Sequence, residues 1–132
     1  MTFFLDADIC IYYLKGQPAV VEAITKLSPS KVKIPAIVQG ELIDGALGSK
    51  HPKENLKIVE TFCEPFDVTP FCRDCALYYG RLRHDLRLKG AMIGPNDLII
   101  ASIVLNHNGT LMTHNTKKFA RVPSLKIFDP IE

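Results

Sequence analysis

The sequence predicts an α/β protein with a parallel sheet covered by helices on both faces. Short β-like runs alternate with helical stretches along all 132 residues, and no repeat, low-complexity tract or linker interrupts them. A chain of this length fits one domain, so we expect a single domain over residues 1–132. Ligands of parallel sheets bind beyond the carboxyl ends of the strands, and we expect the chemistry there.

Five short runs have the composition of buried strands. They are Thr2–Leu5, Val32–Pro35, Phe66–Thr69, Thr110–Thr113 and Lys126–Phe128. Asp6 directly follows the first run, and the segment Thr113-His114-Asn115 stands at the end of the fourth. We therefore expect these polar side chains at the carboxyl edge of the sheet.

The segments between these runs carry helical patterns with helical start and stop signals. Pro52 and Pro95 stand where helix starts tolerate proline, while Gly16 and Gly90 mark helix ends. The expected helices are Ile9–Lys15, Pro18–Leu27, Ala36–Leu47, Lys53–Phe62, Arg73–Leu88 and Asn96–Leu105.

Three carboxylates lie at the ends or centres of apolar elements. Asp6 ends the first strand, Glu41 lies inside AIVQGELIDGAL, which we expect to be mostly buried, and Asp97 lies in the first turn of the helix in GPNDLIIASIVL. A lone ionised carboxylate in apolar surroundings needs a partner or a shifted pKa. No lysine or arginine lies within five residues of any of the three.

Each acid also has a purely structural interpretation. Asp6 can cap the following helix, Glu41 can pair with a lysine or arginine, and Asp97 suits the positive end of a helix that Asn96 caps. If the fold gathers all three, like charges about 4 Å apart repel by about 4 kcal/mol at an effective dielectric near 20, so a cation must neutralise them. Oxygen ligands favour Mg²⁺ or Mn²⁺ over zinc.

The four cysteines do not form a dense disulfide framework. Cys72 and Cys75 have the CxxC spacing, which raises redox or zinc chemistry as alternatives. No close Cys/His pair completes a zinc site, so we interpret the cysteines as helix-start and core residues. They are Cys10, Cys63, Cys72 and Cys75.

Charge and hydropathy narrow the function classes only in part. The net charge of +2 is too small to indicate a polyanionic partner. The first residues lack a basic leader, and no apolar run reaches the roughly 18 residues of a membrane span, so we expect a cytoplasmic protein without membrane contact.

Four stretches, in order, are similar to the motifs of one known family. FFLDADIC resembles its strand-end LDTNI signature, and GELIDGA resembles its helix motif. RLRHDLRLKGAMIGPNDLIIA resembles a basic helix followed by IGxxDxxIA, and LMTHNTKKFARVPSLKIFD resembles TNNTREFERVPGL. The chain thus resembles, nearly end to end, the PIN-domain ribonucleases of the VapC toxin family. The match places Asp6, Glu41 and Asp97 as the catalytic acids and metal ligands.

The resemblance implies both a fold and an activity. The fold would be a five-stranded parallel sheet in an α/β/α sandwich. The activity would be Mg²⁺-dependent hydrolysis of RNA phosphodiesters, with Mn²⁺ as a substitute, on transfer RNA or ribosomal RNA. The family forms homodimers, is neutralised by a VapB-type antitoxin, and reaches operator DNA only through that antitoxin.

The sequence departs from the family pattern at two places. Ala7-Asp8 replaces the usual Thr-Asn, and Asn115 and Lys118 stand where many members carry a fourth acid. We therefore expect a weaker second metal site. Asp8, Thr113 and Asn115 are assigned auxiliary roles, the last two as neutral hydrogen-bonding groups for the attacking water or the scissile phosphate.

RNA requires positive charge beside the metal. The expected phosphate-binding residues are Arg81, Arg83, Arg87, Lys117 and Lys118; the alternative interpretation is a solvated helix face.

Two other functions stay open at this stage. The Asp-x-Asp of LDADI resembles the haloacid-dehalogenase phosphatases, in which Asp6 would be the nucleophile and Asp8 the general acid. The missing fourth acid favours a non-catalytic RNA-binding PIN module.

Overall fold

The centre of the molecule is a five-stranded parallel sheet with the order β3-β2-β1-β4-β5. The computed structural model describes residues 1–131. Its strands are β1 (Phe3–Leu5), β2 (Val32–Pro35), β3 (Asp67–Thr69), β4 (Thr110–Met112) and β5 (Lys126–Phe128). Phe4 of β1 is aligned with Lys33 of β2 on one side and with Leu111 of β4 on the other. The predicted parallel sheet is confirmed, and the first strand of the chain is its central strand.

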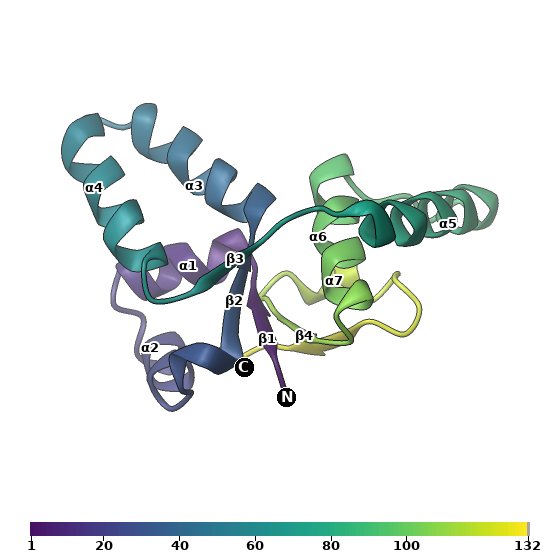
Figure 1. Cartoon of the computed structure of the whole chain (residues 1–132), viewed down its shortest axis with the longest axis horizontal. Helices are drawn as coiled ribbons and strands as arrows, with labels where there is room; N and C mark the ends of the chain where they lie inside the picture. Colours follow the sequence, from purple (N-terminus) through teal and green to yellow (C-terminus); the bar gives the residue numbers. More distant parts are fainter. Residues whose placement is uncertain (132) are drawn as a thin grey trace.

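Helices cover the sheet on both sides. In the view of Figure 1, α1 to α4 lie on one side of β1 and β2, and α5 to α7 lie on the other. The helices are α1 (Ala7–Leu14), α2 (Pro18–Thr25), α3 (Ala36–Leu47), α4 (Pro52–Cys63), α5 (Arg73–Lys89), α6 (Pro95–Asn106) and α7 (Thr116–Phe119), with a 3₁₀ turn at Pro29–Lys31. The predicted α/β/α sandwich is therefore confirmed.

Local signals set several helix ends. The Gln17 side chain accepts a hydrogen bond from the Val20 N–H at 2.9 Å and caps α2. Gly90 ends α5 in the left-handed conformation, with φ of 64°, which glycine adopts without a steric penalty. α6 begins at Pro95, with Gly94 as its N-cap residue and no side-chain cap. The expectation that Asn96 caps α6 is therefore wrong, because Asn96 already lies inside the first turn.

The core lies between the sheet and its helices. Phe4 and Leu5 of β1 are fully buried, and a smaller cluster between α5 and α6 includes Leu86 and Leu98. A Cβ atom at Gly109 would lie 2.6 Å from the Phe4 ring, so the backbone before β4 approaches this ring more closely than any side chain permits. Within residues 1–131, no helix has both the length and the apolar character that crossing a bilayer requires.

One expectation about the helices is wrong, and one helix was not predicted. α3 was expected to be mostly buried, but Leu47 is 57% exposed and Asp44 and Gly45 are exposed as well. The apolar residues of α3 instead border an open groove, described below. The sequence also did not predict α7, because four residues are too few to show a helical period.

Candidate active site

Asp6 lies where the central strand ends and α1 begins. Its side chain is buried, and both carboxylate oxygens are occupied: Oδ1 accepts from the Ala7 N–H at 2.8 Å, and Oδ2 accepts from the Thr113 hydroxyl at 2.8 Å. Its own N–H donates to the Met112 carbonyl at 3.0 Å, which joins the ends of β1 and β4. Asp6 thus caps α1, and it also faces the polar segment after β4.

Burial is the main cause of the raised pKa of Asp6. Desolvation, followed by the nearby Asp8 carboxylate, raises the pKa of Asp6 from 3.8 to about 6. The Thr113 hydroxyl, the Ala7 N–H and the Lys118 ammonium act in the opposite direction and lower it. Burial and the Asp8 charge therefore outweigh the groups that stabilise the ionised form of Asp6.

The raised pKa of Asp6 predicts that the metal-free protein loses stability as the pH rises. A carboxyl group that binds its proton more tightly when folded contributes stability that is complete below pH 3.8 and lost as the pH passes about 6. At one pKa unit per 1.36 kcal/mol, the loss is up to about 3 kcal/mol. Urea unfolding in EDTA between pH 4 and pH 7.5 should show that Asp6→Asn removes this part of the decline.

The matched control is Asp44→Asn, at an exposed carboxylate of α3. Its pH dependence of unfolding should match that of the unmodified protein, because the substitution leaves the buried Asp6 and its partners in place. Equal pH dependence in the unmodified protein and the Asp6→Asn variant would show that Asp6 is not the group responsible.

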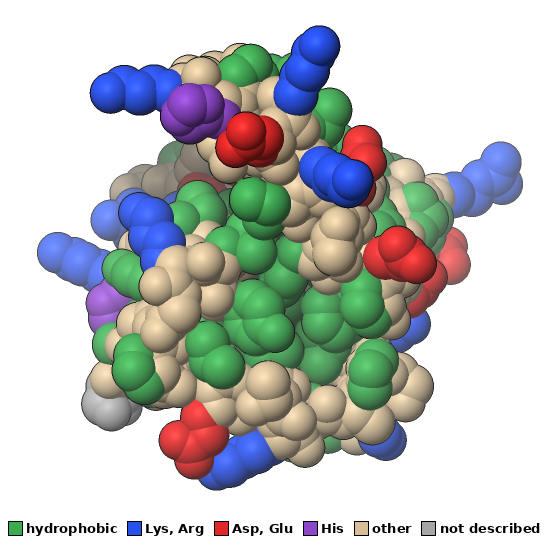
Figure 2. All heavy atoms as spheres, turned by 90° about the vertical axis from the view of Figure 1, so that its left-hand side faces the viewer, with side chains coloured by type: hydrophobic (Ala, Val, Ile, Leu, Met, Phe, Trp, Pro, Cys, Tyr) green, Lys and Arg blue, Asp and Glu red, His purple; other side chains and the backbone are tan. Residues whose placement is uncertain are grey.

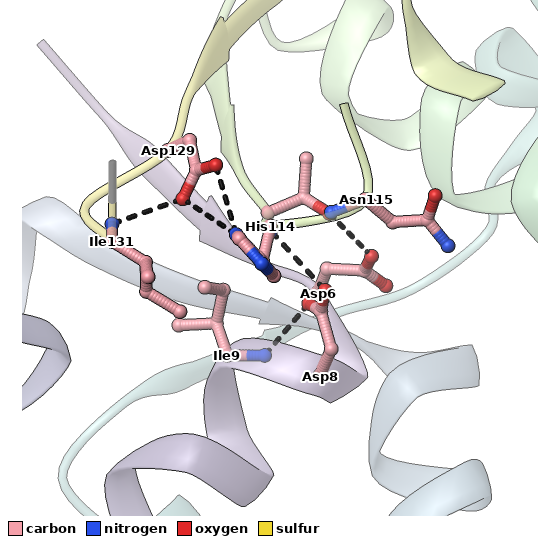
Figure 3. Close-up of polar contacts among 8 residues, drawn as sticks. Asp6, Asp8, Ile9, His114, Asn115, Asp129 and Ile131 are labelled. Carbon is pink, nitrogen blue, oxygen red and sulfur yellow. Dashed lines mark hydrogen bonds and ion pairs between the residues drawn. The ribbon is translucent and has the colours of Figure 1, made fainter. Parts of the chain in front are cut away.

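A second polar cluster adjoins Asp6 (Figure 3). Asp8 accepts from the His114 N–H at 3.1 Å through Oδ2, and from the Ile9 N–H at 2.7 Å through Oδ1. The His114 ring Nδ1 lies 2.9 Å from the Asp129 carboxylate. Asp8, which replaces the usual Asn of the family motif, therefore supplies a carboxylate that holds the turn after β4 in place.

Asp129 is a residue that the sequence analysis missed. It directly follows β5, as Asp6 directly follows β1, so the same signal of an acid after a short apolar strand was present. The Thr113 hydroxyl also accepts from the Asn115 N–H at 3.0 Å, so the segment Thr113-His114-Asn115 does lie at the carboxyl edge as predicted.

Asp97 joins the site in an ion pair. Its Oδ1 lies 3.0 Å from Nζ of Lys118 in α7, and both side chains are partly buried. The same ammonium is close enough to lower the pKa of Asp6. No basic residue lies near Asp97 in the sequence, yet the fold supplies a cation, because Lys118 follows the turn after β4 and reaches the first turn of α6.

Glu41 is not joined to the other two acids by any hydrogen bond or ion pair among the described residues. Its Oε1 is buried and has no hydrogen-bond partner. Glu41 borders a groove of about 550 Å³ between α1, α3 and α4. Within residues 1–131, no group of three or more His, Cys, Asp or Glu side chains is close enough to hold a metal ion.

The chemistry of the individual side chains nevertheless suits a hard divalent cation. Asp6 and Asp97 offer carboxylate oxygens, which Mg²⁺ and Mn²⁺ prefer. The buried Oε1 of Glu41 lacks the partner that a buried polar atom normally has. The Lys118 ammonium provides positive charge beside Asp97 and Asp6 where a metal ion would otherwise provide it.

The basic residues divide into two groups. Arg81, Arg83 and Arg87 are exposed on α5, whose opposite face packs on α6. In α7, Lys117 is exposed, but Lys118 is engaged by Asp97. Lys118 is therefore less available to bind phosphate than the sequence indicated. Contact between these basic residues and RNA stays a prediction.

An apolar surface lies next to the groove that contains Glu41. Figure 2 shows hydrophobic side chains gathered in the middle of this face. A second groove, of about 540 Å³, includes Tyr13, Leu14 and Phe62, and it shares Leu14 and Ile58 with the first. Ile11 and Ile58, which line these grooves, are 44% and 49% exposed, so this face presents large apolar side chains to solvent.

Known proteins resemble this chain in sequence and in fold. The family model of the PIN domain matches residues 3–125. Ribonuclease VapC2 of Rickettsia felis is 36% identical over 129 residues, covering 95% of each chain, and the tRNA(fMet)-specific endonuclease VapC of Shigella flexneri is 34% identical, covering 98% of each. The solved structure of DNA-bound VapBC from Salmonella typhimurium has a TM-score of 0.92, with 32% identity and 98% of both chains covered.

The fold and the matched model define this protein as a PIN domain. The chain belongs to the VapC family of PIN-domain proteins, as the sequence motifs indicated.

Proposed function

We propose that this protein is a Mg²⁺-dependent endoribonuclease and the toxin of a toxin–antitoxin pair, acting in the cytoplasm. The observation that carries the proposal is the buried Asp6 at the carboxyl end of the central strand, whose pKa is lowered by the same Lys118 ammonium that pairs with Asp97 at 3.0 Å. The relatives are named as ribonucleases or endonucleases, which supports the reaction class. The name of the Shigella flexneri relative supports transfer RNA as the substrate.

In this proposal Asp6 and Asp97 hold the metal ion, and Glu41 completes the ligand shell or orients the attacking water. A bound divalent ion lowers the pKa of water and stabilises the charge that develops on the phosphoryl group. Thr113 keeps Asp6 oriented by donating to Oδ2. The exposed Asn115, whose N–H donates to the Thr113 hydroxyl, would hydrogen-bond water or a phosphate oxygen.

Lys118 acts in the proposal as an internal counter-ion. Its ammonium satisfies Asp97 at 3.0 Å, so a divalent ion at Asp97 must displace it or share the carboxylate with it. Many family members carry an acid where this chain has Lys118, so the competition is a property of this sequence. We therefore expect weaker metal binding than an acid at position 118 would give.

The proposed protein partner is a VapB-type antitoxin. The solved relative from Salmonella typhimurium is a VapBC assembly bound to DNA. The two apolar grooves around Leu14 and Ile58 form a surface of the kind that a partner protein covers. In this arrangement a homodimer of the chain would reach operator DNA only through the antitoxin, while the exposed arginines of α5 would contact RNA phosphates.

The phosphatase alternative has lost its support. Asp8 accepts backbone hydrogen bonds from Ile9 and His114, which gives it a structural role in holding the turn after β4. The family match assigns the chain to the PIN domain. The non-catalytic module remains as an outcome of the test below.

The purified protein should cleave RNA internally in Mg²⁺ or Mn²⁺ and should stop when EDTA removes the metal. Sequencing the 5′ ends of the products would identify the target, and we expect transfer RNA. p-Nitrophenyl phosphate is the control substrate and should not be turned over. Binding of RNA without cleavage at any metal concentration would establish the non-catalytic module, and cleavage that survives EDTA would refute the metal-dependent mechanism.

A further inference from the structure

Two cysteines at the start of α5 lie in contact. Cys72 is the N-cap residue of α5, and Cys75 lies in its first turn. Their Sγ atoms are 3.3 Å apart. Cys10 and Cys63, the other two cysteines, are both buried. The CxxC motif that had been interpreted as helix-start and core residues thus brings two thiols together in a geometry that the proposed ribonuclease site does not use.

The two thiols differ in access. Cys72 is exposed, whereas Cys75 is completely buried. A small molecule can therefore reach Cys72 first, and the Cys75 thiol can reach only its neighbour. This asymmetry is what a thiol–disulfide exchange site requires, with one sulfur that attacks and a second that resolves the mixed disulfide.

The surroundings of Cys72 favour its thiolate. The Cys75 N–H is the largest influence and, with the Cys75 thiol and the Asp74 N–H, lowers the pKa of Cys72. The Asn106 side-chain amide at the end of α6 also donates to its sulfur, at 3.6 Å. The N-terminus of a 17-residue helix adds positive potential at this position. Burial has the opposite effect on its partner and raises the pKa of Cys75.

We infer that Cys72 and Cys75 form a redox-active dithiol that closes into a disulfide by exchange with small-molecule disulfides. The Cys72 thiolate attacks the disulfide RSSR, forms a mixed disulfide and releases RS⁻. The Cys75 thiol then loses its proton and attacks the Cys72 sulfur, which releases a second RS⁻. One RSSR is reduced to two thiols, and the protein dithiol is oxidised to one disulfide. This inference does not depend on the proposed ribonuclease activity.

The test uses the reduced full chain and glutathione disulfide as the oxidant. After equilibration across a range of glutathione redox ratios, free thiols are alkylated and counted by mass spectrometry, with peptide mapping. We expect the intact protein to lose two alkylation sites together, at Cys72 and Cys75. Cys75→Ala should instead stop at one glutathione adduct on Cys72, and Cys72→Ser should form no adduct while the protein stays folded.

A variant with Cys10→Ser and Cys63→Ser is the matched control and should oxidise like the unmodified protein. The inference is overturned if the intact chain keeps both thiols in excess glutathione disulfide, or if it accumulates the mixed disulfide at Cys72. The measurement on the unmodified protein decides the question even if a cysteine variant fails to fold.

Discussion

Asp6→Asn will abolish metal-dependent RNA cleavage while the protein stays folded. Asparagine keeps one oxygen that can accept from Ala7 or Thr113, so the cap of α1 and the link to β4 persist in part. It removes the negative charge on which cation binding depends. Because a metal ion contributes several kcal/mol to such a reaction and each 1.36 kcal/mol is tenfold in rate, we expect a loss of about 100-fold or more.

The measurement is the initial rate of RNA cleavage at saturating Mn²⁺, with circular dichroism as the check on folding. Asp44→Asn removes an equal charge from the exposed side of α3 and should leave the rate within about twofold, because water and salt screen an exposed charge. A folded Asp6→Asn variant with full activity would remove Asp6 from the catalytic site and, with it, the proposed mechanism.

Lys118→Met will strengthen the binding of Mn²⁺ in the absence of RNA. Methionine preserves most of the side-chain length but cannot pair with Asp97, so the metal ion no longer competes with the ammonium. A unit charge about 5 Å from the ion opposes it by up to about 3 kcal/mol at an effective dielectric of 20. Since the lysine can also move aside, we expect a smaller gain, about tenfold in Kd.

Isothermal titration calorimetry with Mn²⁺ alone measures this effect without reference to activity. Lys117→Met is the matched control, because Lys117 is the exposed neighbour in the same short helix. Its Kd should change much less than that of Lys118→Met. Unchanged or weaker metal binding in Lys118→Met would mean that the ammonium supports the site and does not compete for it.

The sequence predicted the fold well because its signals are local. Each strand is a short apolar run, and proline or glycine marks several helix boundaries, so the alternation that defines a parallel sheet is visible without contacts. The sequence also predicted that Asp6 and Thr113 lie at the same edge of the sheet, because parallel strands bring their carboxyl ends to one edge.

Pairings between distant residues could not be predicted in the same way. The Asp97–Lys118 ion pair depends on how α7 packs against the start of α6, and the short α7 itself leaves no periodic signal. The His114–Asp129 contact depends on the pairing of β4 with β5. The contact between Cys72 and Cys75 was visible as a spacing, but their difference in burial arises only from the packing of α5.

The placement of β1 has a consequence for biosynthesis. β1 leaves the ribosome before its partner β4, which begins only at Thr110, and the Asp6–Thr113 hydrogen bond spans 107 positions of the chain. Translation adds about 5–20 residues per second, so several seconds separate the two halves of the site. A nascent chain therefore carries Asp6 for this interval without the hydroxyl that orients it, and the edge of the candidate site is completed only after Thr113 has emerged.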